Sequence, residues 1–156
     1  MTWEVSVKLA IGSDERTHLT DVVIEEVKRR GHEVELFGPL DDKKEYWPEV
    51  ARQVAERVAA GEADEGILFC WTGTGISLAA NKVPGIRAAL CADAETARGA
   101  RLWNKANILC MSLRATSEIV AKEMLDTWFA TEYEPNEVDD ICIAQVEAIE
   151  ARYSDR

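Results

Sequence analysis

This 156-residue chain has few histidines and no closely spaced pair of cysteines, which limits the metal sites that it can form. There are two histidines, His18 and His32, and the four cysteines are widely spaced: Cys70, Cys91, Cys110 and Cys142. With so few ligands and no C-x-x-C pair, the sequence predicts no metal site. Cys91 and Cys110 lie within apolar runs, where buried thiols are expected. Free thiols fit a reducing compartment, so we expect a cytoplasmic protein.

Basic charge and long apolar runs are also lacking. Eighteen Lys and Arg residues stand against 29 Asp and Glu residues, which gives a net charge of −11. Because nucleic acids and anionic membranes are bound mainly through Lys and Arg, this balance predicts no nucleic-acid partner and no membrane partner. No apolar run approaches the about 18 residues of a membrane-spanning helix, and the first residues do not resemble a signal peptide.

Short apolar runs alternate with helical patterns along the chain. The predicted strands cover residues 5–12, 32–37, 66–70, 86–91 and 107–111. The predicted helices cover residues 19–30, 48–61, 76–82, 94–102, 117–131 and 138–153. Nearly continuous apolar strands separated by helices are typical of a parallel sheet covered on both faces. We therefore expect an α/β fold, a three-layer α/β/α Rossmann-like single domain with a five-stranded parallel sheet and a C-terminal helix.

The domain is expected to span residues 1–156, with a core over about residues 5–131 and a helical extension over about residues 137–154. Ligands of such sheets bind beyond the carboxyl ends of the strands, near a topological switch point. The polar residues expected at these ends follow the first, third, fourth and fifth strands: Ser13-Asp14-Glu15, Cys70-Trp71-Thr72, Ala92-Asp93 and Ser112-Leu113-Arg114.

Cys70 is the strongest candidate for a catalytic group. It ends an apolar strand and precedes the turn Thr72-Gly73-Thr74-Gly75, which opens a helix. Backbone N–H groups in such a turn lower a thiol pKa and hold an oxyanion, and the glycines let the backbone approach a ligand closely. The residues alone leave two alternatives open: a reactive thiol beside an anion-binding turn, or a small buried side chain before a turn without a ligand.

Other candidates have two interpretations each. Asp14 either orients hydroxyls and moves protons or caps the following helix, and Arg114 either clamps an anion or forms a surface salt bridge. Trp47, Trp71 and Trp103 occupy predicted loops or helix ends. Tryptophan at such positions lines a pocket or a subunit interface, and core packing is the alternative.

Four stretches resemble a known family. They are residues 10–14 (AIGSD), 61–70 (GEADEGILFC), 72–82 (TGTGISLAANK) and 83–89 (VPGIRAA). In this order they are similar to the type B ribose-5-phosphate isomerases, a group that also includes galactose-6-phosphate isomerase subunits. The resemblance covers roughly residues 5–130, and the central motif is long enough to be specific.

The resemblance implies a cofactor-free aldose–ketose isomerase that works through a cis-enediolate. Cys70 matches the family's base, the loop 72–75 its oxyanion donors, and Asp14, Asn104 and Arg114 match an aspartate, an asparagine and a phosphate-contacting arginine. Such enzymes are homodimers or tetramers with active sites shared between subunits. The predicted catalytic residues are Cys70, Thr72 and Asp14. The predicted substrate-binding residues are Glu15, Trp71, Gly73, Thr74, Gly75, Trp103, Asn104 and Arg114.

The chain departs from the family pattern at several positions. Glu15 stands where the family has a histidine, Trp71 where a glycine follows the cysteine, and Trp103 where a histidine is proposed to open the sugar ring. Residues 132–140 (EYEPNEVDD) carry carboxylates where phosphate-binding arginines are expected. The loss of the ring-opening histidine suggests an acyclic substrate such as a tetrose phosphate. The cations that would have to compensate for the missing arginines are Arg16, Lys43, Lys44 and Arg101.

Two other functions stay open at this point. One is a non-catalytic or heteromeric subunit that binds a sugar, which the loss of two histidines and of the tail arginines favours. The other is an isomerase of unphosphorylated sugars, because Trp71 and Trp103 offer surfaces on which a sugar ring stacks. The retained residues favour an enzyme; they are Cys70, Thr72, Asp14 and Asn104.

Overall fold

The structure is a computed structural model that describes residues 4–154, and it confirms the expected α/β fold. Its strands are β1 (Lys8–Ser13), β2 (Glu33–Phe37), β3 (Glu65–Cys70), β4 (Ala88–Leu90) and β5 (Ile108–Ser112). Its α-helices are α1 (His18–Arg29), α2 (Trp47–Ala59), α3 (Thr74–Ala80), α4 (Ala94–Asn104), α5 (Glu118–Ala130) and α6 (Glu137–Tyr153). A 3-10 turn, Gly38–Asp41, follows β2.

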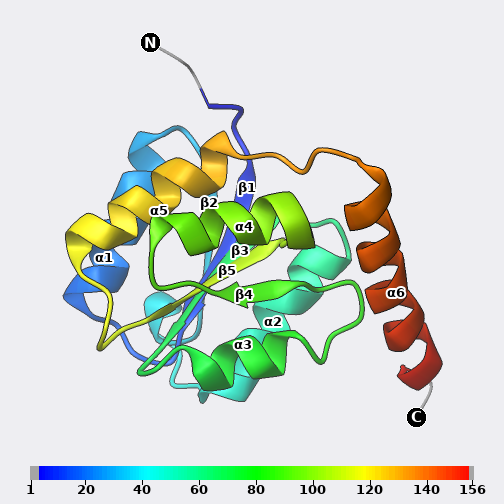
Figure 1. Ribbon diagram of the computed structural model, residues 1–156. Helices are drawn as coiled ribbons and strands as arrows, with labels where there is room; N and C mark the ends of the chain where they lie inside the picture. Colours follow the sequence, from blue (N-terminus) through cyan, green and yellow to red (C-terminus); the bar gives the residue numbers. More distant parts are fainter. Residues whose placement is uncertain (1–3, 155–156) are drawn as a thin grey trace.

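The five strands form one sheet in the order β2-β1-β3-β5-β4, and every neighbouring pair is parallel. Two apolar clusters fill the two faces of this sheet. Helices α1, α4 and α5 contribute to one cluster and helices α2 and α3 to the other. Figure 1 shows these two groups of helices on opposite sides of the sheet. Because helices α1 to α5 run back against the strands, their N-termini lie at the carboxyl edge of the sheet and their C-termini at the amino edge, where α6 begins.

At the amino edge, a buried polar cluster joins β3 to α4 and α5. The Glu65 carboxylate accepts the indole N–H of Trp128 at 3.0 Å and pairs with Arg101 at 2.7 Å. The Arg101 guanidinium lies over the Trp128 ring and also donates to the carbonyl oxygens of Thr131 and Ala106. The Arg101 side chain therefore has a structural role, because its contacts join β3, α4 and α5.

Strands β1 and β4 are each shorter by two residues or more than the apolar runs predict, because side chains replace strand neighbours. At the start of the first strand, the His32 imidazole accepts the N–H of Val7, and Asp64 accepts the N–H of Lys8. The His32 ring is buried and stacks on Phe129 at 4.3 Å, so this histidine has a structural role. At the sheet edge, β4 keeps three residues of the predicted six.

Helix α6 stands beyond the amino end of β4, beside α4 and the loop that precedes β4 (Figure 1). Ile143 is its buried apolar side chain, and the Glu150 carboxylate accepts the N–H of Gly85 at 2.9 Å. A groove of about 950 Å³ separates α6 from β4, α3 and α4. Within residues 4–154, no helix has the length and apolar character that a membrane crossing requires.

Candidate active site

The predicted polar residues gather where β1 and β3 end. These strands lie side by side, but the chain leaves β1 toward α1 on one face and β3 toward α3 on the other, which makes this a topological switch point. The register pairs Ser13 with Phe69, so Asp14 and Cys70 are the next residues on adjacent strands. Adjacent strands are about 4.8 Å apart, so the backbones of Asp14 and Cys70 are neighbours.

The turn after β3 brings hydroxyls and backbone N–H groups next to Cys70. Cys70 is buried, with 5% of its surface exposed. The hydroxyls of Thr72 and Thr74 lie 2.8 Å apart and form a hydrogen bond. Gly73 adopts a φ of 78°, a left-handed conformation that glycine accepts without a Cβ clash. We call residues 72–75 the cradle loop.

Arg114 is fixed beside the same turn by the end of β5. Cys70 pairs with Ser112 in the sheet, the N–H of Leu113 donates to the Cys70 carbonyl, and the N–H of Arg114 donates to the Trp71 carbonyl. A cavity of about 230 Å³ opens here, and both Thr72 and Arg114 line it. A hydroxyl and a guanidinium are both groups that bind anions, so the residue types at this cavity suit an anionic ligand.

Asp14 does not cap the next helix, because Thr17 does so through its side chain. That interpretation of Asp14 is wrong. Burial and the neighbouring charge of Glu15 raise the pKa of Asp14, with burial the larger cause. A carboxyl group with a raised pKa is better suited to carry a proton than an ordinary surface aspartate. Glu15 is exposed, and the Ser13 hydroxyl holds its backbone N–H and carbonyl.

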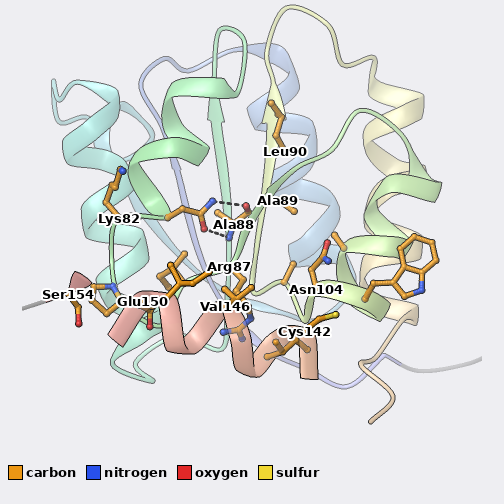
Figure 2. A pocket seen from close by; sticks show the side chains of 18 of the residues that line it. Lys82, Arg87, Ala88, Ala89, Leu90, Asn104, Cys142, Val146, Glu150 and Ser154 are labelled. Carbon is orange, nitrogen blue, oxygen red and sulfur yellow. Dashed lines mark hydrogen bonds between the residues drawn. The ribbon is translucent and has the colours of Figure 1, made fainter. Parts of the chain in front are cut away.

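Trp103 and Asn104 are not brought to Cys70 within one chain. They end α4, at the amino edge of the sheet, and both line the groove beside α6; Figure 2 shows Asn104 there. Leu90 lines this groove and also the small cavity of Thr72 and Arg114, so the two spaces meet at the carboxyl end of β4. The indole of Trp103 is 52% exposed.

The cations expected to replace the missing arginines are mostly occupied. Arg16 pairs with Asp21 at 3.0 Å, Lys43 pairs with Asp41 at 3.3 Å, and Arg101 is held at the amino edge. The acidic residues 132–137 connect α5 to α6 at that same amino edge (Figure 1), so within one chain they stay away from the cradle loop.

Other sequence expectations have mixed outcomes. The thiols of Cys91 and Cys110 are buried as predicted, and burial raises the pKa of Cys91 to about 11. Trp71 is 60% exposed and Trp47 is 38% exposed, so neither is a core residue. Sequence reasoning missed Leu90 and Thr116, which line the small cavity; only the strand order reveals that they lie beside Thr72. Among residues 4–154, no three His, Cys, Asp or Glu side chains are grouped to hold a metal ion.

A prediction concerns the packing of the cradle loop. A Cβ at Gly73 would lie 2.4 Å from Leu90 Cδ1 and 3.1 Å from the Met111 carbonyl carbon, whereas a Cβ at Gly61 would meet nothing within 4 Å. Both glycines have positive φ, so Gly73→Ala and Gly61→Ala share a backbone cost of about 1–2 kcal/mol. Overpacking adds about 1–3 kcal/mol at Gly73 alone. Urea unfolding measures this difference, and equal losses in the two variants would contradict the packing.

Comparisons with known proteins agree with this geometry. The family model described as Ribose/Galactose Isomerase matches residues 9–146. Ribose-5-phosphate isomerase B of Escherichia coli is 39% identical over 128 residues, which cover 81% of this chain and 86% of that protein. D-erythrulose-4-phosphate isomerase 2 of Mycolicibacterium smegmatis is 41% identical over 110 residues, covering 67% of this chain and 72% of that protein.

A solved structure gives the same result for the fold. Ribose-5-phosphate isomerase B of Clostridium thermocellum superimposes with a TM-score of 0.87 at 40% identity, over 94% of this chain and 99% of that one. The motifs at the carboxyl ends of β1 and β3, the matched model and this superposition agree. The chain belongs to the ribose/galactose isomerase family.

Proposed function

We propose that this protein is an aldose–ketose isomerase of a short sugar phosphate, with Cys70 as the base. The observation that carries this proposal is the meeting of Cys70, Asp14, the cradle loop and Arg114 at the switch point of the sheet. Relatives named as isomerases of ribose 5-phosphate and of erythrulose 4-phosphate support the reaction class.

The chemistry requires four proton movements, two through Cys70 and two through Asp14. The Cys70 thiolate takes the proton from C2 of the open-chain aldose, and the carbonyl oxygen on C1 gains negative charge that N–H groups of the cradle loop stabilise. Asp14, whose pKa is raised, gives a proton to that oxygen and accepts one from the hydroxyl on C2. Cys70 then returns its proton to C1, which completes the ketose without a net change in protons.

Arg114 is the proposed partner of the phosphate. Arg114 lines the small cavity together with Thr72, and within residues 4–154 it has no carboxylate partner. A phosphomonoester suits this place because a guanidinium binds phosphate oxygens in a forked geometry. One such cation in a chain of net charge −11 favours a substrate with a single phosphate group.

The length of the substrate follows from ring chemistry. Ribose 5-phosphate closes a five-membered ring through its free O4, so an enzyme that uses it has to open that ring. Erythrose 4-phosphate has O4 esterified, so the same ring does not form. Trp103 stands at the family's ring-opening position, and an indole offers a weakly acidic N–H donor and no proton acceptor. We therefore favour a four-carbon substrate.

Steady-state kinetics test this preference. The value of kcat/KM should be higher on erythrose 4-phosphate or erythrulose 4-phosphate than on ribose 5-phosphate, by about tenfold or more, because most ribose 5-phosphate is cyclic. A higher value on ribose 5-phosphate would contradict the four-carbon assignment. Turnover of plain sugars alone would favour the isomerase of unphosphorylated sugars, and silence on every sugar would favour a binding subunit.

We further propose that the working form is a homodimer or a tetramer built from it. Trp103 and Asn104 lie in the groove beside α6, at the other end of the sheet from Cys70. Within one chain the proposed site lacks both residues. Exposed apolar side chains of α6 flank the groove, with Val146 52% and Ile149 61% exposed. A second copy seated there would cover these side chains.

Charge favours a second copy as the occupant of this groove. Lys82 and Arg87 line it and form no ion pair with any residue in the range 4–154. The first turn of α6 carries Glu137, Asp139 and Asp140. A chain with uncompensated cations in a groove and carboxylates on the adjacent helix offers opposite charges to its own copy.

Light scattering tests this assembly. We expect a mass of about twice 17.4 kDa or a multiple of it at micromolar concentration. The double variant Val146→Asp/Ile149→Asp should fall to the monomer mass, keep its fold and lose activity by about a hundredfold, because the shared site comes apart. Ile119→Asp is the matched control, since Ile119 is 71% exposed on α5 and does not line the groove. A wild-type monomer with full turnover would exclude a shared site.

A further inference from the structure

Strand β4 is an edge strand of the sheet, and one side chain forms hydrogen bonds with its outward-facing backbone. β4 has β5 as its one strand neighbour, with the Arg87 carbonyl and the Cys91 N–H directed to β5. Peptide groups alternate in direction along a parallel strand, so those of Ala88 and Leu90 face outward. Such outward groups normally bind another strand or water.

Asn81 occupies the place of that missing strand at Ala88. Its Nδ2 donates to the Ala88 carbonyl at 2.9 Å, and its Oδ1 accepts the Ala88 N–H at 2.8 Å; two dashed lines at Ala88 in Figure 2 mark these bonds. A carboxamide offers a donor and an acceptor side by side, as a peptide group does. The sheet is therefore closed to strand addition at this residue.

Asn81 is also the residue that ends α3, the helix that the cradle loop opens. The hydrogen bonds therefore tie the last turn of α3 to β4. At the first turn, the Leu90 side chain lies against Gly73, so closely that a Cβ on Gly73 would be 2.4 Å from Leu90 Cδ1. Helix α3 has seven residues, and it touches β4 at both ends, through Asn81 and through Gly73.

We infer that Asn81 is a positioning residue for the cradle loop, an inference that rests on the proposed function. Its hydrogen bonds to Ala88 fix the position of α3 along β4. This position in turn sets the direction of the N–H groups of residues 72–75 beside Cys70. Asn81 itself does not touch the reacting atoms. A displacement of about 1 Å in an oxyanion site is enough to slow a reaction by up to a hundredfold.

Asn107 provides a matched control. Its Oδ1 accepts the Arg87 N–H at 2.8 Å and its Nδ2 donates to the Gly85 carbonyl at 2.9 Å, so it makes the same two kinds of bond at the same lengths. These bonds join β5 to the loop before β4 and do not involve α3. Loss of either carboxamide removes two hydrogen bonds from a side chain to the backbone. Only the loss at Asn81 detaches the end of α3 from β4.

The experiment compares Asn81→Ala, Asn81→Asp and Asn107→Ala with the wild-type protein. All three variants should melt lower by about 2–8 °C. The two Asn81 variants should lose about tenfold or more in kcat with KM within about threefold, whereas Asn107→Ala keeps kcat within about twofold. Asn81→Asp keeps the size of the side chain and the acceptor for the Ala88 N–H, but it places a carboxylate oxygen against the Ala88 carbonyl. It therefore tests the loss of one hydrogen bond without the loss of side-chain volume.

Hydrogen exchange gives a readout that does not depend on turnover. Amides of residues 73–77 should exchange about fivefold faster or more in Asn81→Ala than in Asn107→Ala, and light scattering should give all variants the wild-type mass. Equal exchange at residues 73–77 and equal kcat in the two alanine variants would overturn the positioning role. A wild-type protein silent on every sugar, with the expected exchange difference, would instead overturn the proposed function and leave the positioning of the loop intact.

Discussion

Backbone hydrogen bonds hold β1, β3 and β5 in parallel, with Ser13 beside Phe69 and Cys70 beside Ser112. Every strand thus ends at the same edge, and the loops that follow carry the acid, the thiol, the cradle loop and the arginine. Because the loops after β1 and β3 leave toward opposite faces, the space between them stays open for a ligand. The chemistry we propose depends on this register, since a slip of one residue would turn Cys70 to the other face.

The same topology separates the site into two parts. Helices run from the carboxyl edge to the amino edge, so Trp103 and Asn104 at the end of α4 lie far along the sheet from Cys70 in their own chain. The groove beside α6 holds them, and Leu90 lines both this groove and the small cavity of Arg114. In the proposed dimer, a second copy beside β4 brings its own Trp103 and Asn104 to Cys70. Asn81 prevents strand pairing at this edge by binding the outward backbone groups of Ala88.

Much of this arrangement could be predicted from sequence. Apolar runs ending in Gly12-Ser13-Asp14 and in Cys70 predict parallel strands, and the structure has these strands; the function of the loops that follow them stays a prediction. The strand order could not be predicted, because it depends on contacts between distant segments; hence Leu90 and Thr116 were missed as neighbours of Thr72.

Local sequence patterns also did not predict the partners of individual side chains. Arg101 is one of the cations that could compensate for the missing arginines, yet Glu65 and Trp128 hold its side chain at the amino edge. Asp14 follows a strand as a helix cap does, but Thr17 takes that place. The roles of the site residues, the single-domain boundaries and the cytoplasmic location stay predictions.

Proton NMR in D2O tests the central claim most directly, because it follows the transferred proton itself. With a tetrose phosphate as substrate, wild-type protein should place deuterium at the carbon that receives the proton, since a thiol exchanges with solvent between its two transfers. Cys70→Ala should abolish that incorporation while keeping the fold, and Cys110→Ala, which removes a thiol that lines neither cavity, should retain it. Undiminished incorporation in Cys70→Ala would contradict the assignment of Cys70 as the base.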